Sequence, residues 1–377
     1  MTFITVRLNV LNTPESIIGY IHSAFYGGML IGAIKSEGLI NRVGHIRAYA
    51  VFSSIITITI ILQAFFQTPS LWVLFRFFAG FSISASYVII ESWLLAQSTN
   101  KTKGRILAVY MFCLYLSQAA SQFLLDIVDA NTIEPFLIAA LFSALAIIPS
   151  SVTYMKAPEI QTEYKISMWK YCKTAPLGFV GCTAAGLILS SIYGFLPIYS
   201  QDNELSVSTM LGITIAGGFS LQWPIGKLSD MVDRVKVLTI IPLVIILVCL
   251  FIALVDLPDD GLYTLCFLLG GLCFTIYPVS ISHVCDYFEQ GNIIGITGAL
   301  LFSYGIGSVL GSTIVALLIE NYTSVVVFYY IIFVSLFLAI FGLYIAIKAK
   351  AVSRKDKVNF VALPRATPIA NNLDPRA

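Results

Sequence analysis

The sequence contains few charged residues. Asp, Glu, Lys and Arg make up only 11% of its 377 residues, against about 25% in an average soluble domain, while 58% are hydrophobic. No water-soluble fold of this size buries so much apolar surface, so the composition excludes a soluble enzyme and a disordered protein. The net charge of +2 offers no basic surface for nucleic acid. A multi-pass membrane protein is the class that remains.

The motifs of catalysis and nucleotide binding are also missing. The chain has no Gly-x-x-x-x-Gly-Lys-Ser/Thr loop, no His-Glu-x-x-His and no Gly-x-Ser-x-Gly. This excludes a self-contained ATP-driven pump, and we do not expect an enzyme. The seven cysteines lack metal-ligand spacing and avoid the Lys-poor loops described below. We therefore expect no disulfide framework, no metal and no cofactor.

Long apolar runs are abundant. A helix needs about 20 apolar residues to cross a bilayer, and it satisfies every backbone polar group internally. The runs do not alternate in polarity as barrel strands would. One further apolar piece, Thr2–Leu11, is too short to span. We expect eleven membrane helices: Ser16–Ile34, Ala48–Phe66, Leu71–Leu95, Ile106–Ile127, Pro135–Tyr154, Pro176–Ile198, Val207–Ile225, Val237–Val255, Leu262–Val284, Ile293–Ile319 and Val325–Ile347.

Basic residues are confined to every second loop. Twenty of the 22 lysines and arginines lie in alternate loops and in the C-terminal tail, and only Arg7 and Arg76 lie elsewhere. The intervening loops contain acids but no Lys or Arg. Because cytoplasmic loops carry an excess of Lys and Arg, the basic side and the C-terminus are expected in the cytoplasm.

The two halves of the sequence correspond at an offset of roughly 190 residues. Arg76-x-x-x-Gly80 with Tyr87 corresponds to Cys266-x-x-x-Gly270 with Tyr277, and the loop Asn41–Arg47 corresponds to Asp230–Lys236. Such internal repeats are typical of transporters built from two related bundles.

The same offset would place the partner of Pro176–Ile198 before Met1, so Thr2–Leu11 aligns only with the end of that helix. This indicates a six-plus-six design whose first helix has lost its start, either because the chain is a fragment or because its start codon is placed too late. A genuine eleven-helix protein is the alternative. We expect an N-terminal half at 1–155, a cytoplasmic linker at 156–175, a six-helix half at 176–349 and a disordered cytoplasmic tail at 350–377.

Loop and helix motifs resemble those of the major facilitator superfamily. Gly226-Lys-Leu-Ser-Asp230-Met-Val-Asp233-Arg234 matches the superfamily's loop after its second helix, and the first-half copy has Asn41-Arg42 in the corresponding place. Arg76-Phe-Phe-Ala-Gly80 matches its fourth-helix motif. The resemblance implies two six-helix halves around a central cavity. The stretches Val88–Trp93, Lys103–Arg105, Leu221–Gly226 and Phe274–Val279 look like the bacterial YcaD-type branch, and this resemblance implies a location in a bacterial inner membrane. The fifth helix lacks the Gly-Pro pattern of drug/proton antiporters, which disfavours that activity.

Arg76 is the clearest candidate for a solute contact, since ionisable residues inside a membrane are costly and usually functional. It shares a helix face with Gly80, Tyr87 and Glu91. The alternative is an arginine that reaches the outer surface or that pairs with a structural acid. Glu91 is expected to form a gating salt bridge with Arg42 or with the loop that contains Arg105. Asn41, Asp230 and Arg234 complete the predicted gate.

Other polar and aromatic residues are candidates for the cavity wall because they lie near helix breaks or within spans: Tyr87, Gln118, Gln122, Tyr193, Gln222, Trp223 and Tyr277. Hydrogen bonding and packing between helices, or a position at the membrane interface, explain these residues equally well. For His22 and His283 we expect packed, hydrogen-bonded side chains rather than proton sites, and His283 forms only a weak pair with Asp286.

The sequence thus predicts a secondary active transporter of a small solute that works by alternating access, with coupling to an ion such as H⁺. Its partners are the solute and the lipid bilayer, with no nucleic acid, and a monomer is expected. The alternative is a membrane sensor or interaction protein on the same scaffold, or a degenerate transporter.

Overall fold

In the computed structural model, the described residues are 1–96, 98–99, 102–152, 172–288, 293–348, 360–362, 365 and 367. Every regular element within them is a helix, so the predicted all-α membrane class is confirmed. The first half contains α1 (Thr2–Val10), α2 (Glu15–Val43), α3 (His45–Phe65), α4 (Pro69–Ala96), α5 (Lys103–Gln122), α6 (Leu124–Ile127), α7 (Glu134–Leu145) and α8 (Ile147–Val152). The second contains α10 (Pro176–Asp202), α11 (Val207–Met231), α12 (Arg234–Leu254), α13 (Asp259–Cys285), α14 (Ile293–Asn321) and α15 (Val326–Lys348).

The predicted spans correspond to these helices with two refinements. The expected spans Ile106–Ile127 and Pro135–Tyr154 are each divided, into α5 with α6 and into α7 with α8. By length and composition, ten helical segments of the described chain can cross a membrane. The expected eleventh, α11, is 25 residues long but is not among them, because Gln222 and its serines and glycines lower its mean hydropathy. The expected linker 156–175 lies almost wholly outside the described residues.

Glycine allows the same close helix crossing in both halves. In the first half α2 crosses α4, and a Cβ on Gly80 would collide with the carbonyl oxygen of Phe25. In the second half α11 crosses α13, and a Cβ on Gly270 would collide with the carbonyl oxygen of Thr214. Small residues let helix backbones approach closely, which is the main way that membrane helices gain packing energy. The sequence repeat is therefore also a structural repeat.

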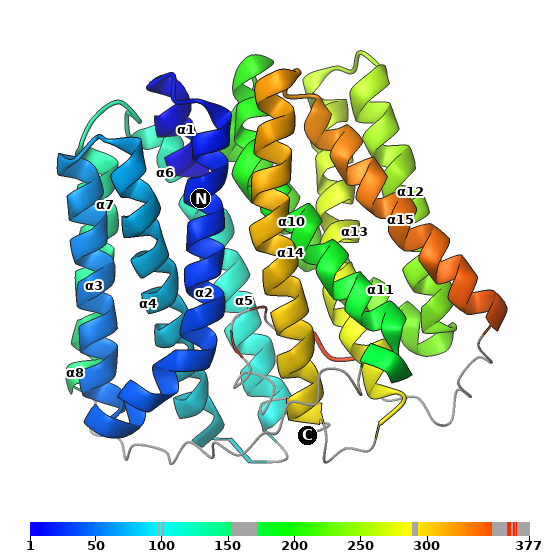
Figure 1. The fold of residues 1–377 in the computed structure, drawn as a ribbon, viewed down its shortest axis with the longest axis horizontal. Coiled ribbons are helices and arrows are strands. Elements are labelled where there is room, and N and C mark those ends of the chain that lie inside the picture. The colour runs from blue at the N-terminus through cyan, green and yellow to red at the C-terminus, as the bar shows by residue number, and fades with distance from the viewer. Residues whose placement is uncertain are drawn as a thin grey trace.

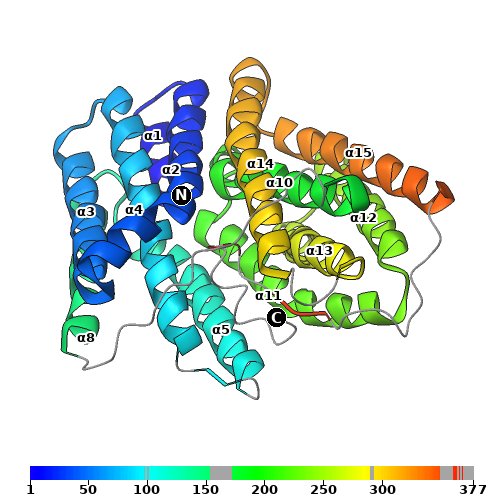
Figure 2. The same ribbon diagram turned by 60° about the horizontal axis from the view of Figure 1, so that its bottom comes forward.

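The two halves stand side by side and meet mainly along α2 with α14 and α5 with α11, with a smaller contact between α1 and α10 (Figures 1 and 2). We call the side with the α2–α3 and α11–α12 turns the basic face, because the lysines and arginines of the loops collect there. The other side is called the opposite face. In Figure 1 the basic face is at the bottom.

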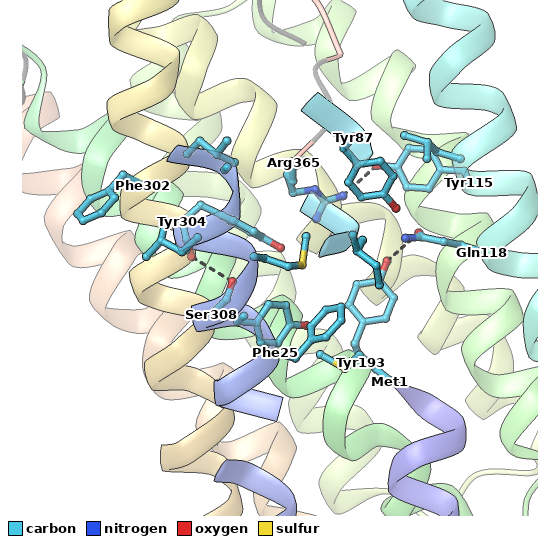
Figure 3. A pocket seen from close by; sticks show the side chains of 18 of the residues that line it. Met1, Phe25, Tyr87, Tyr115, Gln118, Tyr193, Phe302, Tyr304, Ser308 and Arg365 are labelled. Atoms are coloured by element: carbon cyan, nitrogen blue, oxygen red, sulfur yellow. Dashed lines mark hydrogen bonds between the residues drawn. The ribbon is translucent and has the colours of Figure 1, made fainter. Parts of the chain in front are cut away.

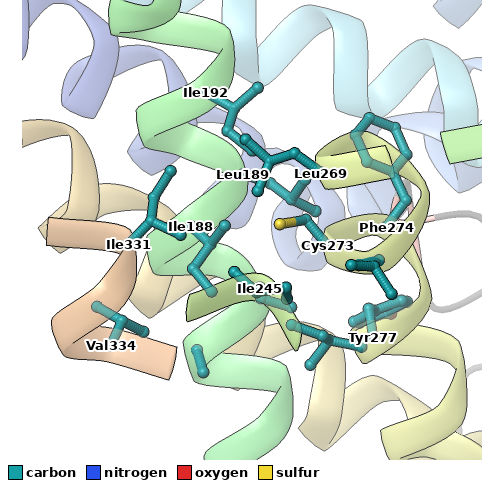
Figure 4. Close-up of a cluster of buried hydrophobic side chains, with 14 of the residues drawn as sticks. Ile188, Leu189, Ile192, Ile245, Leu269, Cys273, Phe274, Tyr277, Ile331 and Val334 are labelled. Carbon is teal, nitrogen blue, oxygen red and sulfur yellow. The ribbon is translucent and has the colours of Figure 1, made fainter. Parts of the chain in front are cut away.

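The second half contains the larger buried core. Its centre is a cluster in which α10, α12, α13 and α15 bring together Ile188, Ile245, Cys273 and Ile331 (Figure 4). Large apolar side chains such as Phe65 and Phe333 are instead exposed on the outer surface. A bilayer would cover this surface, so its exposure is expected for a membrane protein.

Candidate solute cavity

A cavity of about 640 Å³ lies between the two halves. Its walls come from α1, α2, α4 and α5 of the first half and from α10 and α14 of the second. The lining is mainly apolar and aromatic with a few polar groups, which is typical of sites for small molecules. No Asp or Glu lines it among the described residues. Its polar lining residues are Thr2, Tyr26, Tyr87, Tyr115, Gln118, Ser121, Gln122, Tyr193, Tyr304, Ser308 and Arg365.

Four of the eight predicted cavity residues do line this space: Tyr87, Gln118, Gln122 and Tyr193. The Tyr193 hydroxyl donates to Oε1 of Gln118 at 3.3 Å and so links α10 to α5 across the cavity (Figure 3). Nε2 of Gln122 donates to the backbone carbonyl of Gln118 at 3.0 Å. Tyr193 and Gln118 therefore serve both as cavity wall and as a contact between helices, whereas the Gln122 bond lies within α5.

Three other predicted cavity residues lie outside the lining. Gln222 is buried behind it and accepts a hydrogen bond from the Tyr115 hydroxyl at 3.1 Å. Tyr277 is fully buried, with its ring centroid 5.2 Å from that of Tyr304. Trp223 is 69% exposed and faces away from the cavity, since one residue turns a helix by about 100° and its neighbour Gln222 points inward.

Arg76 lies just behind the cavity wall and is only 9% exposed. Its guanidinium carbon is 4.1 Å from the ring centroid of Phe25, and Nη2 is 2.9 Å from the sulfur of Met1. Phe25 and Met1 both line the cavity. Nε of Arg76 has no hydrogen-bond partner, and no carboxylate pairs with Arg76 within the described chain. A buried cation without a counterion is costly, so this position calls for an anionic group nearby.

His22 has the packed environment that the sequence suggested. It is fully buried, and its Nε2 lies 2.7 Å from the hydroxyl of Thr5, which donates to the carbonyl of Gly194 at 2.8 Å. This chain of contacts joins α2 and α1 of the first half to α10 of the second.

The predicted gate residues of the second half form a compact ionic group on the basic face. Arg234 is almost fully buried and pairs with both Asp230, at 2.7 Å, and Asp286. It also donates to the carbonyl of Ser282 at 2.8 Å, which ties α12 to the end of α13. Burial, together with the carboxylates of Asp233 and Asp286, raises the pKa of the adjacent Tyr287. Asp286 therefore pairs with Arg234. From the sequence, we expected only a weak pair between Asp286 and His283.

The first half has no equivalent group. Asn41, Arg42 and Arg105 are exposed, and no ion pair joins Glu91 to Arg42 within the described residues. Glu91 is instead fully buried, and it accepts a hydrogen bond from the Tyr110 hydroxyl at 2.8 Å. The gating bridge of Glu91 stays a prediction, since in this arrangement of the described residues Arg42 lies at the exposed end of α2.

The C-terminal tail supplies contacts that the sequence did not predict. We expected disorder at 350–377, but the described tail residues Phe360, Arg365 and Thr367 lie against the helices, and Arg365 lines the cavity. Apart from Val361 and Ala362, the remainder of the tail lies outside the described residues. No motif marks Arg365 among the other basic residues of the tail, and only the fold shows which of them reaches inward.

Comparison with known proteins agrees with this architecture. The family model of the Major Facilitator Superfamily matches residues 1–302. An uncharacterized MFS-type transporter of Enterobacter sp. is 30% identical, and the match covers 87% of this chain and 86% of the relative. A relative from Yersinia enterocolitica is also 30% identical, with coverage of 86% and 88%. An uncharacterized MFS-type transporter named YcaD, from Salmonella heidelberg, is 29% identical, with coverage of 89% and 88%.

Solved structures show the same fold at low sequence identity. The nucleoside transporter NupG is 16% identical with a TM-score of 0.78, over 93% of this chain and 95% of that one. A bacterial homolog of the human lysosomal transporter Spinster, in an inward-facing and occupied conformation, is 12% identical with a TM-score of 0.72, over 94% of both chains. These likenesses concern the fold.

Proposed function

Because the chain belongs to the major facilitator superfamily, we propose that it is a secondary active transporter, which exposes one central site to the two sides of the membrane in turn. The basic face lies in the cytoplasm, as the distribution of Lys and Arg favours. The solute occupies the cavity between the halves. An ion gradient, such as that of H⁺, drives the cycle.

The pattern of contacts between the halves supports an inward-facing state. Near the opposite face, the Ser23 hydroxyl donates to the carbonyl of Val309 at 2.7 Å, and the backbone N–H of Ser16 donates to Glu320 at 3.1 Å. Between α6 and α11, the Ser208 hydroxyl donates to Asp126 at 2.5 Å at the same end. These bonds seal the outer end, whereas the cavity reaches toward the basic face through residues such as Ala33.

The position of Arg76 indicates the charge of the solute, and this observation carries the proposal. A guanidinium that is nine-tenths buried beside the cavity, with no carboxylate partner in the described chain, favours a solute with a carboxylate, phosphate or similar group. The cavity lining adds no negative charge that would offset it. We therefore propose an anionic or zwitterionic solute and assign Arg76 as its charge partner.

A ligand panel tests this proposal. The purified protein is heated with size-matched carboxylates, phosphates, amino acids and amines, since a ligand that binds the folded form raises its apparent Tm. An anionic or zwitterionic compound is expected to raise Tm, and Arg76→Ala is expected to abolish that shift. Arg47→Ala, which removes an exposed arginine, is the matched control and should keep the shift.

Uptake of the radiolabelled hit into proteoliposomes then tests transport. We expect Arg76→Ala to lower the initial rate by about tenfold or more, because the solute loses its charge-assisted contact. Stabilisation by amines alone, or full uptake by Arg76→Ala, contradicts the assignment. Stabilisation by a compound that is never transported favours the alternative of a membrane sensor on the same scaffold.

A further inference from the structure

We propose that the C-terminal tail is an intramolecular inhibitor, whose residues Phe360, Arg365 and Thr367 dock in the opening of the cavity toward the basic face and hold the two halves in their present arrangement. The proposal rests on the transporter function given above. Three described tail residues carry it, and each contacts a different part of the opening. Their order along the chain takes the tail from α11 of the second half to α4 of the first.

The first anchor is the tail residue Phe360, which contacts α11. Its backbone N–H donates to Oδ1 of Asp230 at 2.8 Å, the same oxygen that pairs with Arg234. Its ring lies directly against Gly226, where a Cβ would collide with the ring. The tail therefore uses both the carboxylate and the glycine of the loop motif that the sequence predicts to be part of the gate.

The second anchor is Arg365, which points into the cavity (Figure 3). Its Nη2 donates to the Tyr115 hydroxyl at 2.8 Å, and its guanidinium carbon is 4.5 Å from the ring centroid of Phe274. Tyr115 belongs to α5 and Phe274 to α13, so this one side chain bridges the two halves. A guanidinium over an aromatic ring is attractive, and more so where water is excluded.

The third anchor is the tail residue Thr367, which contacts α4. Its side chain is fully buried, and its hydroxyl donates to Oε2 of Glu91. Glu91 is the buried carboxylate of the first half that the sequence assigns to the gate. The tail thus engages one gate acid from each half, Asp230 and Glu91.

These contacts oppose the outward-facing stage of a transport cycle. To face outward, the halves must close over the basic face, and Arg365 occupies the space that closure would remove. Because the docked tail binds one of two conformations, it shifts the population toward that conformation. The tether keeps its effective concentration high, so weak individual contacts suffice.

Cysteine accessibility tests docking without knowledge of the solute. Ala33→Cys places a thiol in the cavity lining, after Cys113 and Cys172, the two cysteines that are not buried, are changed to serine. The rate of modification by a water-soluble maleimide is measured on the purified protein. We expect Arg365→Ala and deletion of residues 360–377 to raise this rate roughly fivefold, because the docked fraction falls. Arg376→Ala, in the same tail, is the control and should leave the rate unchanged.

A synthetic peptide of residues 357–370 should slow the reaction again in the truncated protein. Equal rates in the full and truncated chains, with unchanged elution on size exclusion, would overturn docking whether or not the protein transports anything. With the hit from the ligand panel, truncation should also raise the initial uptake rate severalfold. If truncation and Arg365→Ala lower uptake while the maleimide rate rises, Arg365 is a solute-binding residue and the inhibitory role is wrong.

Discussion

The two halves share a backbone plan and differ in where they place charge. Both cross their paired helices at an equivalent glycine, Gly80 in the first half and Gly270 in the second. At the position one turn earlier, the first half has Arg76 and the second has the fully buried Cys266. The repeated sequence therefore determines the scaffold, and the departures from the repeat show where the two halves do different work.

The loops of the basic face differ in the same way. In the second half, Asp233 caps α12 by accepting a hydrogen bond from the N–H of Val235, and the next residue, Arg234, is buried between two carboxylates. In the first half, the corresponding residues are Gly44, at a positive φ of 85°, and His45, which is buried beside Trp93. The turn of the second half thus contains buried ion pairs, whereas the turn of the first half has exposed arginines and, among the described residues, no ion pair.

Changing the shared crossings should have the largest effect on stability. Gly80→Leu and Gly270→Leu each force a side chain into the carbonyl oxygen of the facing helix, so we expect neither variant to yield a folded, monodisperse protein. Size-exclusion elution and thermal unfolding of the purified variants measure this. Gly27→Leu is the control, because no atom lies near its built Cβ. A well-folded variant at only one of the two crossings would break the equivalence of the halves.

The ionic turn provides the next largest effect. Asp286→Ala leaves Arg234 buried with Asp230 as its remaining carboxylate, and breaking a buried ion pair costs about 3–5 kcal/mol. We expect a marked fall in the Tm of the second half, measured by thermal unfolding or by hydrogen exchange of α12 and α13. Asn41→Ala, which removes an exposed uncharged side chain from the corresponding turn of the first half, should change stability by less than about 0.5 kcal/mol. Equal losses in the two variants would show that the turns are energetically alike.

The sequence predicts more of the scaffold than of the site. Apolar run length predicts the spans, because the bilayer requires helices of a fixed minimum length. It does not predict where a long helix divides, as at Phe123 and Ala146, since local packing decides that. Helical periodicity could not separate Gln222 from Trp223, because the facing direction depends on how α11 is rotated against its neighbours. The role of Arg365 depends on a contact between distant parts of the chain, which no local pattern contains.

The smallest effect is expected at Cys266, the second-half counterpart of Arg76. Its thiol is fully buried in an apolar cluster, outside the cavity lining, so Cys266→Ala removes packing alone. We expect a loss of roughly 1 kcal/mol in stability and no change in the Tm shift that the anionic or zwitterionic hit produces. The same two measurements on Arg76→Ala should show the reverse, with the ligand-dependent shift abolished. If Cys266→Ala also abolished that shift, the solute would depend equally on both halves, and the asymmetry inferred from Arg76 would be lost.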